Sequence, residues 1–393
     1  MRVYFAPCGI ALGHAGRCIA IAKLFKKRGN DVIFSTYGEA IDFVRKAGFY
    51  VEEVPKITFY EKEDGTFDIR RTLSAGPKII IKFFQQIGAE ISLMERFKPN
   101  VIVSDSRLSS IIAAKVMGFN SILILHQLRI MIPHLKPINR RIKQKIKSFV
   151  ERLGLDMLGS LWNLSNIIVV PDFPPPYTIA KANVVPSSKY IKKLKLVGPI
   201  ISKYPWDLPL SEDIRRELDL DDRPLIFAAM SGTIAEKKYI TELLIKIFQD
   251  FPDRYNIIVS KGFPNGNSCR KLKNLMIFDW VEDRYTLLKA CDILITRGGH
   301  NTVSEAIYYG KPMIIIPTPA HSEHQGIAKS MVEMGVAKSI QQHELSRESL
   351  LEAIDEILNN SEILSRVENA RRFAHNFNAI DTIFNIINKI NND

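Results

Sequence analysis

The stretch from Ala290 to Gln325 restricts the possible folds of this chain more than any other part of the sequence. Its residues are ACDILITRGGHNTVSEAIYYGKPMIIIPTPAHSEHQ. An apolar segment ends at Thr296, two glycines follow, a helical pattern begins near His300, and a second apolar segment comes after a short turn. This order predicts a strand, a tight turn, a helix and a second strand, as in α/β proteins with a parallel sheet. Consecutive glycines also let the backbone turn sharply without a Cβ to obstruct a bound group.

The beginning of that helix is a predicted phosphate site. Unpaired N–H groups and the positive end of the helix dipole face the glycine turn, and the dipole alone contributes about 0.3–1 kcal/mol toward binding an anion. Glu305 comes one helical turn after Asn301, so its carboxylate lies on the same helix face, about 6 Å further along the axis. A carboxylate accepts hydrogen bonds, and the 2′,3′-diol of a ribose offers two donors. The stretch therefore favours a nucleoside diphosphate.

Three groups of residues in this stretch carry a family resemblance: R-G-G-H-N-T-V-S-E, G-K-P-M-I-I-I-P and the later H-Q. They resemble the donor-binding signature of UDP-sugar glycosyltransferases. The nearest forms are those of the peptidoglycan lipid-intermediate N-acetylglucosaminyltransferases and the related galactolipid synthases. The residues also resemble those of the UDP-glucuronosyl and UDP-glucosyltransferases, and all of these are GT-B enzymes of families 1 and 28. The resemblance implies an α/β fold of two Rossmann-like, doubly wound parallel-sheet domains that face each other across a cleft. An ordinary βαβ unit of another doubly wound domain is the alternative.

The N-terminal loop carries a second resemblance. A strand pattern over residues 2–6 is followed by a loop to His14, a helical pattern over residues 15–27 and a strand pattern over residues 31–36. The glycines are spaced G-x3-G-x2-G, which disfavours a dinucleotide fingerprint. The sequence G-H-A-G-R instead resembles the N-terminal motif in which a histidine at the loop–helix junction is the base, and Gly13 lies beside the donor. His14 is therefore the predicted catalytic base, or else a polar residue that only satisfies the loop.

Asp105 is the candidate partner of His14. It stands at the end of the strand pattern over residues 101–104. Strand ends gather beside the ligand cleft of an open parallel sheet, so the two side chains could meet there. A carboxylate hydrogen-bonded to one ring nitrogen would fix the tautomer that leaves the other nitrogen free to accept a proton. A structural acid that caps the strand end is the alternative.

The resemblance also implies a set of donor contacts. Ser231 and Gly232 match a loop that touches the phosphates, and the backbone at Trp280–Val281 matches the position that reads the uracil edge. The pair His324–Gln325 matches residues that contact sugar hydroxyls. The signature itself contributes Arg297, Gly299, His300, Asn301, Thr302 and Glu305. Arg297 stands where plant-type members have His, and His324 stands where members often have Asp or Gln, so the sugar stays open. Trp280 has a core aromatic as its alternative.

Length and composition favour a globular protein of two to three domains. The chain has 393 residues, of which 46% are hydrophobic and 24% charged. We expect an acceptor-binding domain over residues 1–198, a linker over 199–209 that is rich in proline, a nucleotide-sugar-binding domain over 210–375, and a C-terminal helix over 376–393 that packs back on the first domain. Helical patterns at 346–358 and about 362–391 close the chain.

The sequence also suggests a location for the protein. No apolar run is long enough to span a membrane, and the N-terminus lacks a signal-peptide pattern. The 4 cysteines show no metal-ligand spacing, as expected of reduced thiols in the cytoplasm.

Positive charge is concentrated in the first half of the chain. The net charge is +12, and residues 1–200 hold 31 Lys and Arg against 15 Asp and Glu. Eight of these basic residues lie between positions 129 and 152, interleaved with apolar ones. This pattern favours an amphipathic face on an anionic membrane surface, with an ordinary solvated helix as the alternative. No nucleic-acid-binding motif accompanies the charge, so nucleic acid is disfavoured as a partner.

Together these features predict an inverting, metal-independent hexosyltransferase. It would move a sugar from UDP to a hydroxyl or phosphate of a lipid-linked, polyprenyl-type or other acceptor, in the cytoplasm or on the inner face of the cell membrane. Inversion is implied by the resemblance. We expect no metal and no cofactor beyond the UDP-sugar co-substrate, because no D-x-D motif follows a strand end. A UDP-sugar epimerase of the non-hydrolysing 2-epimerase type and a catalytically idle nucleotide-sugar-binding subunit are the alternatives.

Overall fold

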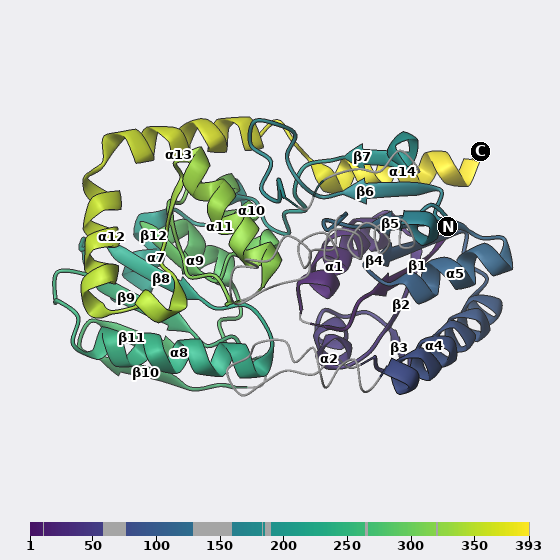
Figure 1. Cartoon of the computed structure of the whole chain (residues 1–393), viewed down its shortest axis with the longest axis horizontal. Coiled ribbons are helices and arrows are strands. Elements are labelled where there is room, and N and C mark those ends of the chain that lie inside the picture. The colour runs from purple at the N-terminus through teal and green to yellow at the C-terminus, as the bar shows by residue number, and fades with distance from the viewer. Residues whose placement is uncertain are drawn as a thin grey trace, which may run out of the picture.

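The computed structural model describes residues 1–10, 12–57, 76–128, 159–182, 184, 190–263, 266–319 and 321–392. Two α/β domains lie side by side along the long axis of the molecule (Figure 1). The basic segment 129–152 lies outside the described residues, so the predicted membrane-binding face is not part of the structure discussed below.

The N-terminal domain is built on a seven-stranded parallel sheet with the order β3-β2-β1-β4-β5-β6-β7. The first six strands repeat the 3-2-1-4-5-6 order of a Rossmann fold. Its strands are β1 (Arg2–Pro7), β2 (Asp31–Thr36), β3 (Val51–Glu53), β4 (Val101–Asp105), β5 (Asn120–Ile124), β6 (Ile167–Val170) and β7 (Leu194–Leu196). Its helices are α1 (Gly13–Lys27), α2 (Glu39–Lys46), α4 (Gly76–Phe97) and α5 (Leu108–Met117).

The C-terminal domain repeats this arrangement. Its sheet has the order β10-β11-β9-β8-β12-β13-β14, and only the edge pair β10–β11 is antiparallel. The strands are β8 (Leu225–Ala229), β9 (Asn256–Ser260), β10 (Cys269–Leu272), β11 (Leu275–Phe278), β12 (Ile293–Thr296), β13 (Met313–Ile315) and β14 (Ala337–Ser339). The helices are α7 (Ser211–Glu217), α8 (Ile234–Gln249), α9 (Arg284–Ala290), α10 (His300–Tyr309), α11 (Ser322–Met334), α12 (Arg347–Asn359) and α13 (Ser361–Ala374). A last helix, α14 (Ala379–Asn392), follows α13.

Continuous apolar strands explain why both sheets are covered on two faces. All residues of β12 and β13 are buried, as are all residues of β4 and β9. Strands of parallel sheets read as unbroken apolar runs because helices pack on both sides of them. The prediction of two doubly wound parallel-sheet domains is confirmed.

The C-terminal helix of the chain belongs to the core of the N-terminal domain. Ile383 and Ile387 on α14 are buried in the same cluster as Val3 and Phe5 of β1. Figure 1 shows α14 lying along the N-terminal domain after α13 has crossed the C-terminal one. The single helical pattern at 362–391 is therefore wrong: the structure breaks it between Ala374 and Ala379. One straight helix could not follow the cores of two different domains.

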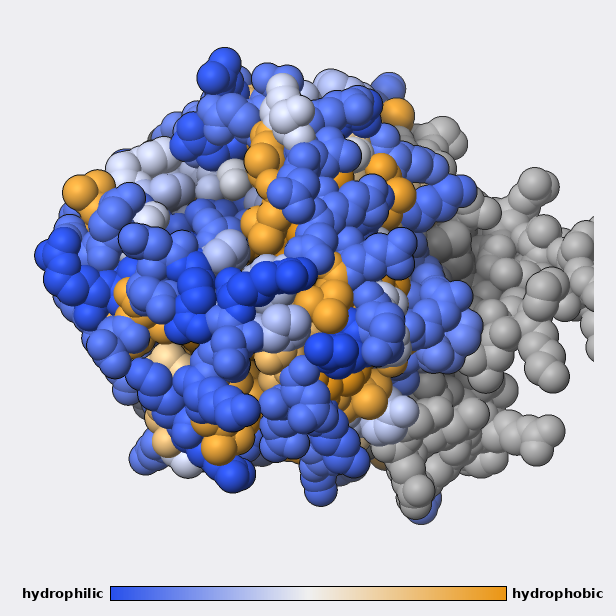
Figure 2. Space-filling view, turned by 90° about the vertical axis from the view of Figure 1, so that its left-hand side faces the viewer, coloured by the Kyte–Doolittle hydropathy of each residue, from blue (hydrophilic) through white to orange (hydrophobic). Residues whose placement is uncertain are grey.

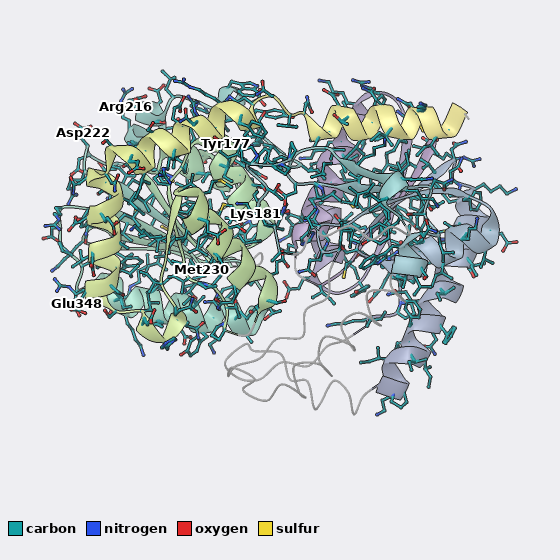
Figure 3. All side chains as sticks on the ribbon, turned by 45° about the horizontal axis from the view of Figure 1, so that its top comes forward. Tyr177, Lys181, Arg216, Asp222, Met230 and Glu348 are labelled. Carbon is teal, nitrogen blue, oxygen red and sulfur yellow. The ribbon has the colours of Figure 1, made fainter. Side chains whose placement is uncertain are left out.

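A second segment crosses in the opposite direction. Phe173, Ile179 and Ala180 follow β6 in the N-terminal domain, but they are buried in the core that surrounds β8. Figure 3 places Tyr177 beside α13 and Lys181 at the boundary between the domains, and the rings of Tyr177 and Phe373 are 4.7 Å apart. This part of the expected N-terminal domain therefore packs on its partner, which sequence composition did not indicate.

The outer face of the C-terminal domain is mostly hydrophilic, with apolar side chains in narrow strips (Figure 2). Among the described helices, none combines the length and apolarity that crossing a bilayer requires.

Candidate functional site

The N-terminus of α10 lies against the loop that follows β8. Gly298 turns the chain after β12 with φ +84°, a conformation that favours glycine. A Cβ at Gly299 would come within 2.9 Å of Ser231 Oγ, so the close approach of the two loops requires this glycine. Ser231 Oγ is itself buried without a hydrogen-bond partner among the described residues. A buried polar atom of this kind indicates a place where a ligand or water binds.

The structure brings His14 and Asp105 together. His14 lies in the first turn of α1, Asp105 ends β4, and His14 Nδ1 is 2.7 Å from Asp105 Oδ1. The His14 side chain is 21% exposed, whereas that of Asp105 is fully buried. Burial alone would raise the pKa of the Asp105 carboxyl, but Arg17 and His14 more than offset it, and the pKa falls well below its ordinary value. Asp105 is therefore an ionised partner for the imidazole.

Arg17 completes this group, and sequence reasoning missed it. Its guanidinium donates from Nε to Asp105 Oδ2 at 2.7 Å and from Nη2 to Asp105 Oδ1 at 2.8 Å. Nη2 also lies 2.9 Å from His14 Nδ1. Arg17 follows His14 by three positions on α1, and residues three apart share a helix face. The spacing of three residues between His14 and Arg17 is the sequence signal from which the role of Arg17 could have been predicted.

Asn301 connects this group to the C-terminal domain. Its Oδ1 accepts a hydrogen bond from Arg17 Nη1 at 2.7 Å, and its Nδ2 donates to the carbonyl oxygen of Gly13 at 3.1 Å. Both polar groups of the Asn301 side chain are therefore bound to the N-terminal domain. The contact of Asn301 with the donor stays a prediction.

A second histidine–carboxylate pair also spans the domains. His126, just after β5, has its Nε2 at 3.0 Å from Glu323 Oε1 in the first turn of α11, and Gln127 donates to the other oxygen of Glu323. Nearby, His300 Nε2 lies 3.2 Å from Asp172 Oδ2, and the rings of His126 and His300 are 5.1 Å apart. None of these contacts was predicted, because each joins residues of different domains.

Comparisons with known proteins agree with this geometry. Residues 238–381 match the model of the glycosyltransferase family 28 C-terminal domain. An uncharacterized glycosyltransferase of Methanosarcina acetivorans is 27% identical over 392 residues, which cover 99% of this chain and 98% of that protein. The structure of spinosyn forosaminyltransferase SpnP covers 100% of both chains with a TM-score of 0.71 at 15% identity. The chain is a GT-B glycosyltransferase whose C-terminal domain matches that of family 28.

A further relative is an enzyme with a lipid-linked substrate in its name. The UDP-N-acetylglucosamine–N-acetylmuramyl-(pentapeptide) pyrophosphoryl-undecaprenol N-acetylglucosamine transferase of Desulforudis audaxviator is 23% identical over 411 residues, covering 99% of this chain and 98% of that enzyme. The prediction of a glycosyltransferase from the residues around Arg297 is confirmed, and the epimerase and the idle binding subunit are set aside.

The Glu305 carboxylate is buried, and hydrogen-bond partners among the described residues bind only one of its two oxygens. Its Oε1 accepts hydrogen bonds from Arg284 Nη2 at 2.6 Å and from the Tyr285 hydroxyl at 2.9 Å. Its Oε2 is buried with no hydrogen-bond partner among the described residues. Burial raises the pKa of Glu305, while Arg284 opposes the rise. The carboxylate thus keeps one oxygen available to a hydrogen-bond donor such as a ribose hydroxyl.

Arg297 provides a buried positive charge beside the glycine turn. Its side chain is 1% exposed, and it donates to two neutral groups, Gln342 Oε1 at 2.9 Å and Thr318 Oγ1 at 2.7 Å. Burial lowers the pKa of Arg297 to about 10, so it is still protonated at neutral pH. A buried cation with neutral partners is stabilised further when an anion binds nearby.

The pair expected to contact the sugar lies at the start of α11. His324 Nδ1 is 2.9 Å from the hydroxyl of Thr318, the same threonine that binds Arg297. Burial lowers the pKa of His324 well below its ordinary value, so this imidazole is neutral. Gln325 exchanges hydrogen bonds with Gln341 at 3.1 and 3.3 Å. Both side chains are therefore fixed by their neighbours.

The remaining predicted donor residues lie at the same edge of the sheet. Trp280 and Val281 follow β11 and are half-buried, and Thr302 is buried in the first turn of α10. Gly232 has φ +123°, and a Cβ there would come within 2.5 Å of Glu236. Among the residues that the structure describes, no cluster of His, Cys, Asp or Glu has the geometry of a metal site.

Proposed function

We propose that this glycosyltransferase moves a hexose-type sugar from UDP to a hydroxyl or phosphate of a lipid-linked acceptor, with inversion and without a metal ion. The observation that carries the proposal is the contact between the two halves of the site. Asn301, in the first turn of the donor helix α10, hydrogen-bonds the backbone of Gly13, the neighbour of His14, at 3.1 Å. This contact supports the proposal, because it brings the candidate base close to the candidate phosphate site at the start of α10.

His14 supplies the base in this proposal. Its Nδ1 is engaged with Asp105 at 2.7 Å, which leaves Nε2 to accept the acceptor's proton as the acceptor oxygen attacks the anomeric carbon. The bond from that carbon to the UDP oxygen breaks in the same displacement, so the configuration inverts. A base of this kind accelerates a reaction by about 10²–10⁴-fold.

The leaving diphosphate gains negative charge, and two features of this chain can stabilise it. The N-terminus of α10 presents unpaired N–H groups and a positive dipole end. Arg297, buried beside the same turn, adds a full positive charge. These groups do what a divalent ion does in other transferases, and they support the proposal that no metal is required.

Glu305 favours a ribonucleotide. Its free Oε2 can accept from a ribose hydroxyl, whereas thymidine diphosphate, which lacks the 2′-hydroxyl, offers one donor fewer. Titration calorimetry with UDP, TDP and GDP in EDTA tests this donor class. We expect the tightest binding for UDP. The proposal fails if no uridine nucleotide binds, or if TDP binds at least as tightly.

The proposed acceptor and location rest on an exposed apolar face of α4. Ile80, Ile81 and Phe84 are 57%, 58% and 66% exposed and lie within one turn of each other. Lys78 precedes them and Lys82 lies between Ile81 and Phe84. Apolar side chains with neighbouring cations are typical of surfaces that rest on anionic lipid, where a lipid-linked acceptor such as that named for the Desulforudis relative would be found.

Flotation with anionic liposomes at low and high salt tests this location. We expect binding at low salt that Ile81→Ser combined with Phe84→Ser abolishes. The matched control is Val116→Ser on α5, which removes a side chain that is 68% exposed elsewhere on the domain. Equal flotation of the α4 variant and the control would contradict the proposal.

A further inference from the structure

Arg17 connects the pair of His14 and Asp105 to Asn301 at the start of α10. Its side chain is 4% exposed, and all three guanidinium nitrogens have polar partners. Two nitrogens hold both oxygens of Asp105, and the third reaches Asn301 in the other domain at 2.7 Å. A buried arginine with bidentate geometry has a fixed orientation, because its planar fork matches a carboxylate.

This orientation matters for the tautomer of His14. Both Asp105 Oδ1, at 2.7 Å, and Arg17 Nη2, at 2.9 Å, lie within hydrogen-bond distance of His14 Nδ1. A guanidinium can only donate, so Nδ1 either accepts from Arg17 or donates to Asp105. Only the second arrangement leaves an unprotonated Nε2 on a neutral ring. The position of the guanidinium therefore decides whether His14 is ready to accept a proton.

Asn301 holds the guanidinium from the far side. Its Oδ1 accepts from Arg17 Nη1, and its Nδ2 donates to the Gly13 carbonyl, so one side chain fixes both Arg17 and the loop that carries His14. Asn301 belongs to α10 of the C-terminal domain, whereas the residues it binds belong to α1. These contacts can form only when the two domains are together.

We propose that Arg17 and Asn301 are positioning residues that make the alignment of the His14–Asp105 pair depend on the closing of the two domains. The inference rests on the proposed function of His14 as the base. It assigns the side chain of Asn301 to the catalytic apparatus of the other domain and not to the donor phosphates. In such an arrangement His14 is held in its reactive orientation only when α10 is packed against α1. His14 therefore does not activate water while the domains are apart.

Asn301→Ala tests the assignment, because it removes both contacts and leaves the charges in place. We expect kcat to fall at least tenfold, while the Kd for UDP in EDTA stays within about threefold of the wild-type value. Tyr204→Phe is the matched control. It removes the hydrogen bond of 3.1 Å between the Tyr204 hydroxyl and Asn378, which joins the segment at 199–209 to the connection between α13 and α14, away from the base, and kcat should not change.

Two results would overturn the inference. The first is UDP binding that Asn301→Ala weakens tenfold or more at unchanged kcat, which would make this side chain a phosphate ligand. The second is no change in either quantity. Failure of the proposed function is distinguishable from both, because then the wild-type protein itself would bind no uridine nucleotide.

Arg17→Lys gives an independent measurement. Lysine keeps the positive charge beside Asp105 but cannot reach Asp105 and Asn301 in the same fixed plane. We expect kcat to fall by at least tenfold with UDP binding retained, and the double variant Arg17→Lys/Asn301→Ala to be no slower than the worse single variant. Residues that act as one unit show such non-additivity. Multiplicative effects in the double variant would contradict the coupling.

Discussion

At the scale of single residues, His126 makes folding depend on pH. Burial lowers its pKa from 6.5 to about 4, with Glu323 opposing the shift and Arg17 and His300 adding to it. The unfolded chain therefore takes up this proton near pH 6.5, whereas the folded chain does so only near pH 4. Between these values the unfolded state binds more protons, so the free energy of unfolding decreases as the pH falls.

We expect the protein to lose about 2 kcal/mol of stability between pH 7.5 and pH 5 through this residue. Denaturant unfolding at the two pH values measures the loss. His126→Gln is the control, because an amide can still donate to Glu323 and does not titrate. The variant should lose correspondingly less stability on acidification, and an equal loss in both proteins would show that other groups are responsible.

Glu305 should distinguish ribose from deoxyribose. In the wild-type protein we expect UDP to bind about tenfold more tightly than 2′-deoxy-UDP, from the 1.5–3 kcal/mol of a charge-assisted hydrogen bond less the water that replaces it. Glu305→Gln keeps the shape of the side chain and removes the charge. Calorimetry with both nucleotides should find that the preference falls to about threefold or less. An unchanged preference for UDP over 2′-deoxy-UDP would mean that Glu305 binds only Arg284 and Tyr285 and not the ribose.

The sequence predicts some of these contacts and misses others for a physical reason. His14 and Asp105 both follow strands of one parallel sheet, and the rule that strand ends meet at one edge was enough to bring them together. Glu323 meets His126, and His300 meets Asp172, across the boundary between the domains. Such pairs depend on how two finished domains dock, which no local pattern within one domain encodes.

At the scale of elements, the packing of the N-terminus of α10 against the loop after β8 requires an N-cap residue without a side chain. Gly299 has φ −63° and ψ 134°, an ordinary conformation, so replacing it does not strain the backbone. A Cβ at this position would nevertheless lie 2.9 Å from Ser231 Oγ. We expect Gly299→Ala to cost about 1–3 kcal/mol of stability through overpacking and to weaken UDP binding, as measured by thermal unfolding and calorimetry.

The double variant Gly299→Ala/Ser231→Ala isolates the cause. Without Oγ, the atom of residue 231 nearest to the added Cβ is the Cβ at 3.8 Å, which is ordinary contact. Stability should return to near that of Ser231→Ala alone. Gly88→Ala is a second control, because nothing lies within 4 Å of its added Cβ in α4. If the double variant is as unstable as Gly299→Ala, the contact with Ser231 is not the reason.

Periodicity and turn residues predicted most elements of the two sheets. The strand pattern over residues 31–36 coincides with β2, and the helical pattern over 15–27 begins two residues after the start of α1 and ends with it. The break between α13 and α14 was missed because apolar spacing continues across it. The apolar side chains of the two helices face different cores, Ile363 that of the C-terminal domain and Ile383 that of the N-terminal domain.

At the scale of the whole molecule, the end of the chain stabilises its beginning. Ile383 is fully buried between α14 and the N-terminal core. We expect Ile383→Ala to cost about 2–5 kcal/mol and to increase hydrogen exchange in α1 and β1 more than in α8 or β9. Asn385→Ala, an exposed position on the same helix, is the control. Equal loss of protection in both domains would contradict a separate N-terminal core that includes α14.

The way the domains share their chain was beyond sequence reasoning. Phe173 and Ile179 follow an N-terminal strand and pack around β8, and α14 follows a C-terminal helix and packs on α1. Composition and proline content marked the linker at 199–209, but an apolar side chain is equally suited to either core. Only the packed molecule decides which core it joins.

The release of UDP from UDP-sugars in EDTA, with a membrane lipid extract as the source of acceptor, tests the central claim most directly. The wild-type protein should release UDP only when acceptor is present. His14→Gln should be slower by about 10²–10⁴-fold while it binds UDP as tightly as the wild-type protein. Undiminished release by His14→Gln would contradict the assignment of the base, and release from no UDP-sugar would contradict the proposed donor.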